Sequence, residues 1–392
     1  MTTALQGGRV LLPDGSIEQT DLVVSPEGIE RIGEPAGRAA TLRADGFLIL
    51  PGLIDLHGDA FERQLMPRPR VSFDPRIALR DTDRQLVANG ITTAFHALTY
   101  SWEPGLRGRE AALAFLDTLD SLQGELACDT RLHLRQETFN LDAVDEIEGW
   151  IGAGRVQLLA FNDHVEHIRK ETDSPEKLAR YADRSGLATP AFLALLARVS
   201  ARADEVPEAV ARLAAAARRA GVTMASHDDE TPEIRAHYHA LGAMLCEFPL
   251  DARTAEAAQA LGSPVIMGAP NIVRGGSHAD RFSAHEAFRR GLCSVLTSDY
   301  YYPAMHHAAF RLVRDGDATL GAAWRAVSTD AAKAAGLSDR GEIATGRRAD
   351  LVLVNDERAE RPVIAATMAG GRIVHLADAR LLSAAAASPV YA

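Results

Sequence analysis

Eight short apolar runs, separated by longer stretches of helical character, constrain the fold of this chain more than any other sequence feature. Between the runs, stretches such as 110–122, 207–220 and 252–261 carry apolar residues at helical spacing. Strands that alternate with helices indicate a parallel sheet with helical crossovers. Eight such units over roughly 250 residues are typical of a (β/α)8 barrel. We therefore predict the α/β class, with a TIM-like barrel over residues 49–340. The predicted strands lie at 47–57, 90–98, 131–137, 156–164, 222–229, 243–249, 263–270 and 293–299.

The two ends of the chain have a different pattern. Residues 8–50 contain short strand-like runs broken by turn sequences at Asp14-Gly15 and Glu27-Gly28. After Gly341 the sequence becomes strand-like again. We expect residues 1–48 and 341–392 to form together a small β-sandwich-like domain outside the barrel.

Composition and charge exclude several classes of protein. The 392 residues carry 42 Lys and Arg against 53 Asp and Glu, a formal net charge of −11, which argues against nucleic-acid or anionic-membrane binding. No apolar run reaches the length of a membrane span, and no secretory signal pattern opens the chain. The three cysteines are widely spaced, which suits a reducing compartment. We expect a cytoplasmic protein that acts on a small molecule; the sequence leaves open whether it assembles into a homo-oligomer.

Imidazole and carboxylate side chains recur where the predicted strands end. In a barrel, the carboxyl ends of the strands meet at one rim. His57 and Asp59 are two apart, so in an extended segment both point to the same side. The candidate metal ligands are His57, Asp59, Glu137, His164, His227 and Asp299. Convergent acids and imidazoles without thiolates predict one or two divalent ions; zinc is our first choice, with manganese and iron as alternatives.

Two segments with arginine, glycine and other polar residues lie next to these strand ends. One reads Pro-Arg-Pro-Arg at 67–70, and the other reads GAPNIVRGGSH at 268–278. Arginine forks and consecutive backbone N–H groups bind phosphate oxygens. An extended linker and an ordinary turn are the structural alternatives. The candidate substrate-binding residues are Arg68, Arg70, Asn271, Arg274, Gly275, Gly276, Ser277 and His278.

Competing catalytic motifs are absent from the sequence. There is no G-x-x-x-x-G-K-[ST], no G-x-G-x-x-G, no G-x-S-x-G and no H-E-x-x-H. Nucleotide dehydrogenases, P-loop enzymes and serine hydrolases are therefore disfavoured.

The strings PGLIDLHGD and GEIATGRRADLVLV, with an Asp closing the eighth strand, resemble the metal-dependent amidohydrolase superfamily. The strings RLHLRQE, ASHDDET, MGAPNIVRGGSHADR and TSDYYYPA are similar to the alpha-D-ribose 1-methylphosphonate 5-triphosphate diphosphatases of the carbon–phosphorus lyase pathway. The resemblance implies metal ligation by His57, Asp59, Glu137, His227 and Asp299, with His164 as an additional ligand.

Two departures from that family pattern bear on specificity. The family reads H-T-D-N where this chain has HGDA at 57–60, and it follows the strand-four Asp-His with a Pro-Gly-Gln loop where this chain has VEHIRKE. We expect metal binding to survive both changes. The second change alters a segment that opens onto the pocket.

The predicted chemistry is metal-assisted hydrolysis that releases pyrophosphate. Asp299 is the candidate base, and Glu137 is either a bridging ligand or a base behind the ligands. A C–N hydrolase on the same scaffold, either a deacetylase or a cyclic-amide hydrolase acting on an anionic small molecule, is the first alternative. A non-catalytic barrel without metals is the second.

Overall fold

The computed structural model describes residues 2–35, 37, 39–68, 71–276, 282–358 and 360–382. Its centre is a near-closed barrel of eight parallel strands in sequence order, as predicted. Every predicted strand region overlaps one of them. The barrel strands are β6 (Leu53–Gly58), β7 (Ile91–Tyr100), β8 (Asp129–Glu137), β9 (Leu158–Asn162), β10 (Thr223–His227), β11 (Leu245–Glu247), β12 (Val265–Gly268) and β13 (Val295–Thr297).

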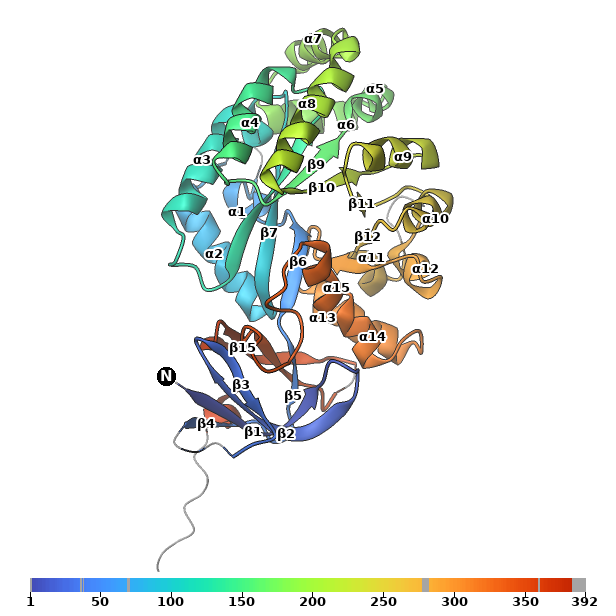
Figure 1. Cartoon of the computed structure of the whole chain (residues 1–392). Helices are drawn as coiled ribbons and strands as arrows, with labels where there is room; N and C mark the ends of the chain where they lie inside the picture. The colour runs from blue at the N-terminus through green and yellow to red at the C-terminus, as the bar shows by residue number, and fades with distance from the viewer. Residues whose placement is uncertain are drawn as a thin grey trace, which may run out of the picture.

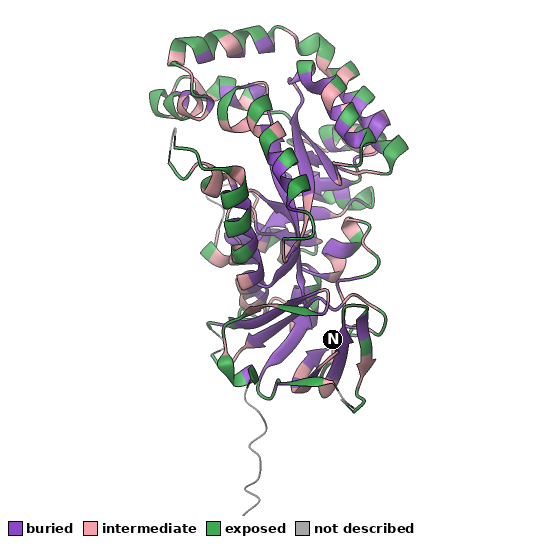
Figure 2. Ribbon diagram, turned by 90° about the vertical axis from the view of Figure 1, so that its left-hand side faces the viewer, coloured by how far each residue is buried: buried purple, intermediate pink, exposed green. Residues whose placement is uncertain are grey.

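Helices surround the barrel strands, and Figure 1 shows them on the outside of the sheet. The strands are buried almost throughout, while the helices present exposed outer faces (Figure 2). The helices are α1 (Glu62–Leu65), α2 (Pro75–Ala88), α3 (Arg109–Ser121), α4 (Val144–Gly152), α5 (Val165–Glu171), α6 (Pro175–Ser185), α7 (Thr189–Ser200), α8 (Val206–Ala220), α9 (Pro232–Ala240), α10 (Ala252–Ala260), α11 (Ala269–Arg274), α12 (Ala284–Arg289), α13 (Ala304–Arg314), α14 (Leu320–Arg325) and α15 (Thr329–Ala334). Short 3-10 turns are η1 (Gly105–Arg107), η2 (Leu141–Ala143), η3 (Ala203–Glu205) and η4 (Ala379–Leu382).

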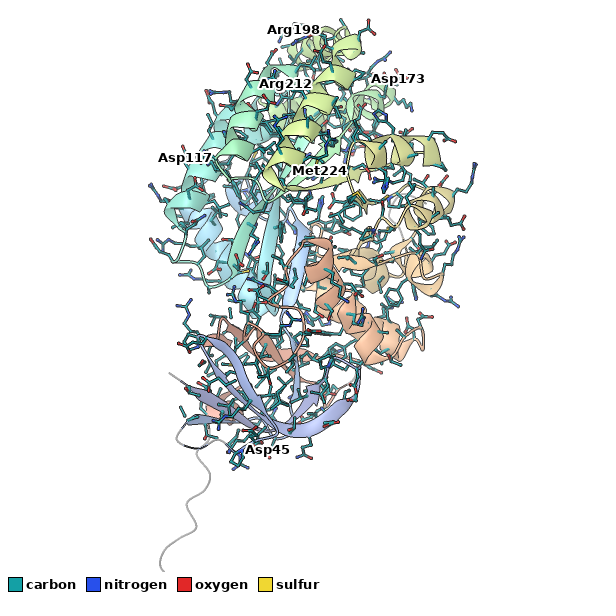
Figure 3. All side chains as sticks on the ribbon, viewed as in Figure 1. Asp45, Asp117, Asp173, Arg198, Arg212 and Met224 are labelled. Atoms are coloured by element: carbon teal, nitrogen blue, oxygen red, sulfur yellow. The ribbon has the colours of Figure 1, made fainter. Side chains whose placement is uncertain are left out.

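Local chemistry sets the helix ends. At the start of α2, the Asp74 side chain accepts a hydrogen bond from the Arg76 N–H, and Pro75 occupies the first helical turn, where its missing N–H costs nothing. The three helices predicted at 110–122, 207–220 and 252–261 correspond to α3, α8 and α10. Figure 3 shows Asp117 and Arg212 on the exposed outer faces of α3 and α8.

The two chain ends build a second, mixed sheet, in agreement with the sequence. Its order is β16-β15-β14-β5-β1-β2-β3, with β4 paired to β1. The strands are β1 (Thr3–Leu11), β2 (Ile17–Ser25), β3 (Gly28–Ile32), β4 (Ala40–Arg43), β5 (Leu48–Pro51), β14 (Leu351–Asn355), β15 (Val363–Ala369) and β16 (Arg372–Leu376). Residues 341–350, which we expected to be strand-like, form turns that lead into β14.

Hydrogen bonds join this terminal sheet to the helices around the barrel, both from its N-terminal strands and from its C-terminal strands. The Trp324 indole N–H on α14 donates to the Pro51 carbonyl at 2.9 Å, and the Thr367 hydroxyl on β15 donates to the Val87 carbonyl at 2.7 Å. Leu48–Pro51, the first part of the predicted strand at 47–57, pairs with β14 in this sheet. The domain limits at 48/49 and 340/341 stay a prediction.

Among the residues that the structure describes, no helix has both the length and the apolarity needed to cross a bilayer.

A buried carboxylate joins the first and last barrel strands. Asp55 on β6 is fully buried and accepts hydrogen bonds from the Ser298 N–H at 3.0 Å and from the Ser298 hydroxyl. The two residues are 243 positions apart in the chain. Beside them, Gly58 and Asp299 form a parallel β-bridge, and the Asp299 N–H donates to the His57 carbonyl at 2.9 Å. This seam brings the two ends of the barrel sequence to one point on the rim.

We predict that Asp55→Ala destabilises the protein by about 1–3 kcal/mol, because it leaves buried Ser298 donors without an acceptor. Urea unfolding measures the change. Asp45→Ala, which removes an exposed carboxylate paired with Arg43, is the control and should stay within about 0.5 kcal/mol of the wild type. Equal stability of the Asp55 variant and the wild type would contradict this role.

Candidate metal centre and anion pocket

Three residues with left-handed backbone stand at the ends of barrel strands. Asp228 follows β10 with φ 58°, Phe248 follows β11 with φ 52°, and Asp299 follows β13 with φ 53°. Such a conformation is costly for residues other than glycine, and a bulky aromatic residue adopts it rarely. Strain of this kind concentrates at functional rims, where the surrounding structure holds a side chain in place.

His57, at the end of β6, belongs to two groups of donor atoms. One group joins it to Asp59 and Asp299, and the other joins it to His133 and Glu247. Within each group the donor atoms lie within 4.8 Å of one another. Burial, followed by the charge of Arg135, holds the pKa of His57 well below its usual range, so the imidazole is neutral and can donate a lone pair.

The buried group His57, His133 and Glu247 fits a metal ion. The His133 Nδ1 lies 2.9 Å from the Leu56 carbonyl, which can only accept, so Nδ1 carries the proton and Nε2 carries a lone pair. That Nε2 lies 3.6 Å from a Glu247 carboxylate oxygen and has no hydrogen-bond partner within the described ranges. Burial lowers the pKa of His133 to about 3. The same carboxylate lies 3.3 Å from the His57 Nδ1. The unpartnered Nε2 lone pair of His133, turned towards this buried carboxylate, fits a metal ion between them.

A second group comes from the neighbouring strands. It contains His164, His227 and Asp228, at the ends of β9 and β10. The His164 Nδ1 lies 2.6 Å from a Glu137 carboxylate oxygen, and its Nε2 faces Asp228 at 3.7 Å. Burial lowers the pKa of His164, but Glu137 and Asp228 outweigh it and raise the pKa to about 9. At this pKa the ring is protonated near neutral pH, so a metal ion at Nε2 would have to displace that proton, with Glu137 orienting the ring from behind.

The group of His164, His227 and Asp228 adjoins the two groups that contain His57. The His57 and His227 rings lie 5.4 Å apart between centroids, and the His227 and His164 rings 5.9 Å apart. Phe248 packs edge-on against both His57 and His227, at 5.0 and 5.2 Å. The structure thus brings His57, Asp59, His164, His227 and Asp299 together, and it places Glu137 behind His164. Their roles as ligands remain proposals.

Arg135 lies between these groups. Its Nη1 is 3.4 Å from Asp59, and its Nη2 is 3.2 Å from the His227 Nε2. When the Asn162 amide is oriented with its oxygen towards the guanidinium, that oxygen accepts from Arg135 Nε and Nη2 at 3.1 and 3.2 Å. A guanidinium can only donate, so the His227 Nε2 presents its lone pair here.

Sequence reasoning missed His133, Arg135 and Glu247. His133 and Arg135 precede Glu137 at intervals of two on β8, so the period-two rule that links His57 to Asp59 could have found them. Glu247 is the last residue of β11 and could have been found as a strand-end acid.

In the structure, the described residues of the two predicted phosphate-binding segments make contacts within the protein. Gly275 and Gly276 end α11, and their N–H groups donate to the Asn271 carbonyl, so these donors cap a helix and are not presented to an anion. Arg274 lies 3.4 Å from the Tyr300 hydroxyl, and Arg68 forms an isolated bridge with Val71. Arg70, Ser277 and His278 lie outside the described residues.

A cavity of about 220 Å³ adjoins the donor groups. Its lining includes Asp59, Glu137 and His164 together with Arg107, Arg135 and Arg184. A wider cavity of about 1240 Å³ shares His164 and Arg184 with it.

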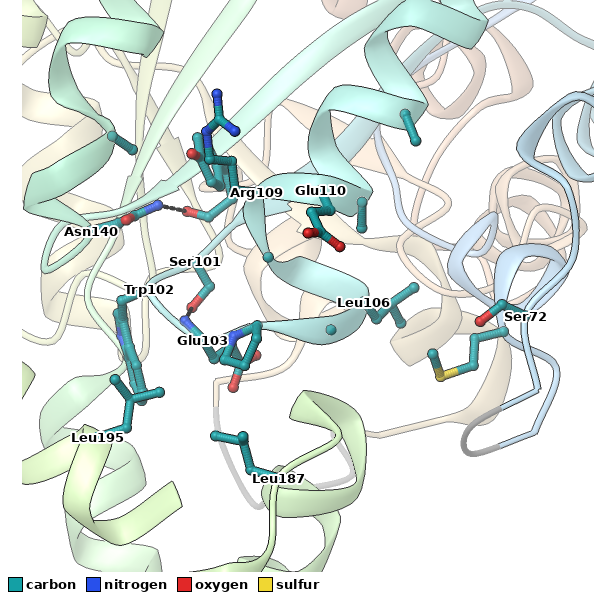
Figure 4. Close-up of a pocket in the computed structure, with 18 of the residues that line it drawn as sticks. Ser72, Ser101, Trp102, Glu103, Leu106, Arg109, Glu110, Asn140, Leu187 and Leu195 are labelled. Atoms are coloured by element: carbon teal, nitrogen blue, oxygen red, sulfur yellow. Dashed lines mark hydrogen bonds between the residues drawn. The ribbon is translucent and has the colours of Figure 1, made fainter. Parts of the chain in front are cut away.

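A third cavity, of about 1180 Å³, touches the 220 Å³ cavity at Ser101 and Glu103. Figure 4 shows this third cavity with Trp102 beside Leu195.

The two departures from the family pattern have structural counterparts. A Cβ atom on Gly58 would lie 2.6 Å from an Asp55 oxygen and 3.0 Å from the Ser298 hydroxyl, so the seam leaves no room for a threonine there. The residues VEHIRKE after His164 form the helix α5, which contributes His167 to the cavity wall.

Comparisons with known proteins agree with this geometry. Residues 48–374 match the model of the Amidohydrolase family. A protein of Escherichia coli strain K12 named alpha-D-ribose 1-methylphosphonate 5-triphosphate diphosphatase is 35% identical over 323 residues, which cover 79% of this chain and 84% of the relative. An adenine deaminase of Methylobacterium sp. strain 4-46 is 27% identical over 383 residues, 92% of this chain, although the match spans 56% of that enzyme.

Solved structures share the fold at low identity. An amidohydrolase from an environmental sample of the Sargasso Sea aligns with a TM-score of 0.66 at 17% identity, covering 96% of this chain and 93% of that one. A dihydropyrimidinase from Brevibacillus agri aligns with a TM-score of 0.60 at 14% identity, covering 96% and 95%. The family match over most of the length, together with the 35% identical relative, shows that this chain is a hydrolase that belongs to the amidohydrolase superfamily.

Proposed function

We propose that this hydrolase cleaves a phosphoric anhydride and releases pyrophosphate from a triphosphorylated ribose phosphonate, the substrate named for the Escherichia coli relative. The observation that carries the proposal is the 220 Å³ cavity, in which two of the proposed metal ligands, Asp59 and His164, line one space with three arginine side chains. A divalent ion and a polyphosphate can bind side by side in this cavity, whereas a neutral amide carries no charge for several guanidinium groups to pair with.

We propose that the ion or ions are held by His57, Asp59 and Asp299 on one side and by His164 and His227 on the other, with His133 and Glu247 completing the buried group. Zinc suits these nitrogen and oxygen donors. When bound, such an ion polarises a phosphoryl oxygen and lowers the pKa of water from about 15.7 to about 7.

The chain's own acid–base chemistry centres on Asp299. Burial, and then the charge of Asp59, raise the pKa of Asp299 to about 7, so this carboxylate can accept a proton near neutral pH. In the proposed step, Asp299 takes a proton from water, the water oxygen bonds to the α-phosphorus, and the bond from that phosphorus to the bridging oxygen breaks. Pyrophosphate leaves with the electron pair. Glu137 acts as a positioning residue that fixes the His164 ring.

Hydrolysis of a C–N bond is the second candidate function, because the adenine deaminase match extends over 92% of the chain. The same donor groups would serve it, since the scaffold does not decide the substrate.

A substrate panel separates the two candidates. The metal-loaded protein is incubated with ribose triphosphates, nucleoside triphosphates, N-acyl compounds, cyclic amides and adenine, and pyrophosphate is assayed beside ammonia and free amine. We expect pyrophosphate from triphosphates bearing a ribose. Release of ammonia or amine without pyrophosphate would replace the proposal with the C–N hydrolase.

Metal content tests the buried group directly. His133→Asn should lower the bound divalent metal at least about tenfold in affinity, because it removes the lone pair that faces Glu247. Elemental analysis and competition with a chelator measure the change. His96→Asn is the matched control, since His96 is also a buried barrel histidine but belongs to no donor group among the described residues. Parallel metal loss in both variants would point to general destabilisation.

Asp299→Asn tests the base. We expect kcat to fall by about 10²–10⁴-fold, because the amide accepts no proton from water, with metal content near normal. Steady-state kinetics and elemental analysis report the two quantities separately. Turnover like that of the wild type would remove Asp299 from the mechanism.

A further inference from the structure

Three arginines from separate elements line the 220 Å³ cavity. Arg107 lies at the end of η1, Arg135 lies on β8, and Arg184 lies near the end of α6. None of them belongs to the arginine segments that sequence reasoning selected for phosphate. Arginine binds phosphate through its planar fork of N–H donors.

Each guanidinium is paired with a carboxylate, so its position is fixed before a ligand binds. Arg107 Nε and Nη2 donate to the two Glu62 oxygens at 2.9 and 3.0 Å. Arg184 lies 2.7 Å from Glu103, whose side chain is 1% exposed. The Arg184 Nε is buried and has no hydrogen-bond partner within the described part of the chain. A buried donor without an acceptor is costly and can be satisfied by a ligand oxygen, and the two Glu103 oxygens, which also have no hydrogen-bond partner within the described part of the chain, need a donor in return.

Close backbone packing keeps two of the arginines side by side. A Cβ atom at Gly105, which has φ +82°, would lie 2.5 Å from the Arg184 carbonyl, so η1 and the end of α6 touch at this glycine. The contact sets the spacing between Arg107 and Arg184. It also places α6, which follows the departing segment VEHIRKE, in the wall of the cavity.

Acidic side chains at the cavity match the three arginines in number. Three carboxylates, Asp59, Glu103 and Glu137, also line it. Asp59 is a proposed metal ligand, and Glu137 holds His164, so both have cationic partners on the metal side. The Arg184 Nε, which has no hydrogen-bond partner within the described residues, remains as a donor for a ligand, and Arg107 uses only its Nε and Nη2 on Glu62.

The sizes of the two adjoining cavities suit different parts of a substrate. The 220 Å³ cavity is the smaller one and suits a compact anionic group. The neighbouring cavity of about 1240 Å³, which shares Tyr181 and Arg184, has room for the sugar part.

We infer that the 220 Å³ cavity binds the diphosphate end of the substrate, the future pyrophosphate, through Arg107, Arg135 and Arg184. This assignment rests on the proposed function, and it places the α-phosphorus between the arginines and the metal donors.

Pyrophosphate binding to the metal-loaded protein, measured by isothermal titration calorimetry, tests the assignment independently of turnover. Arg184→Gln should weaken binding at least about tenfold and raise KM for the triphosphate, whereas Arg184→Lys, which keeps the charge and loses the fork, should give a smaller loss. The double variant Glu103→Gln/Arg184→Gln avoids an unpaired buried charge and should bind as weakly as the single Gln variant. Arg155→Gln is the matched control, because Arg155 is an ion-paired arginine of similar exposure at another face of the barrel.

The outcomes separate this assignment from the proposed function. If the wild type binds pyrophosphate through Arg184 but releases none from any triphosphate, the cavity assignment stands and the diphosphatase proposal fails. If the wild type releases pyrophosphate while the folded Arg184 variants bind it as tightly as the Arg155 control, the assignment is overturned. A loss of affinity equal in the Arg155 control would also overturn it.

Discussion

Closure of the barrel between β6 and β13 is the constraint on which the rest of the site depends. His57 and Asp59 come from the first barrel strand, and Asp299 comes from just beyond the last. Their donor atoms share one group because the Asp299 N–H donates to the His57 carbonyl and the Asp299 carbonyl accepts from the Asp59 N–H at 3.0 Å. Backbone hydrogen bonds thus set the spacing of the side chains. A barrel open at this seam would keep its strands and lose the shared centre.

The interior at the rim is unusually rich in ionisable groups, and pairing explains how it tolerates them. Glu62 faces Arg107, Glu103 faces Arg184, and Glu137 faces His164. Burial of any one of these charges without its partner would cost several kcal/mol. The group of His57, His133 and Glu247 differs, because burial keeps both imidazoles neutral, and the His57 Nδ1 lies 3.3 Å from the Glu247 oxygens. The ion pairs hold the pocket in shape, whereas the two neutral imidazoles and the acid fit a metal site.

Sequence patterns predicted the barrel because short strand-like runs alternate with amphipathic helical stretches, and the period of two linked His57 to Asp59. The same rule, applied to RLHLRQE, would have reached His133 and Arg135. Arg107 and Arg184 were beyond such reasoning, since η1 and α6 meet only through tertiary packing at Gly105. Conversely, the conspicuous GG at 275–276 suggested an anion site, but helix capping uses its N–H groups. A local motif shows which donors exist, and packing decides whether they are available.

Packing also bears on how one scaffold can serve different reactions. The donor groups lie at the ends of barrel strands and turn towards the rim, whereas the wall of the 220 Å³ cavity comes in part from α5 and α6, inserted between β9 and β10. Strand ends are held by ladders of backbone hydrogen bonds, so they change little when a sequence diverges. A helical insertion is attached at its two ends and by side-chain contacts, so it can be exchanged with smaller consequences for the barrel. Because His167, Tyr181 and Arg184 all lie on α5 and α6, a change in these helices would alter the wall of the cavity and leave the donor groups of the barrel strands in place.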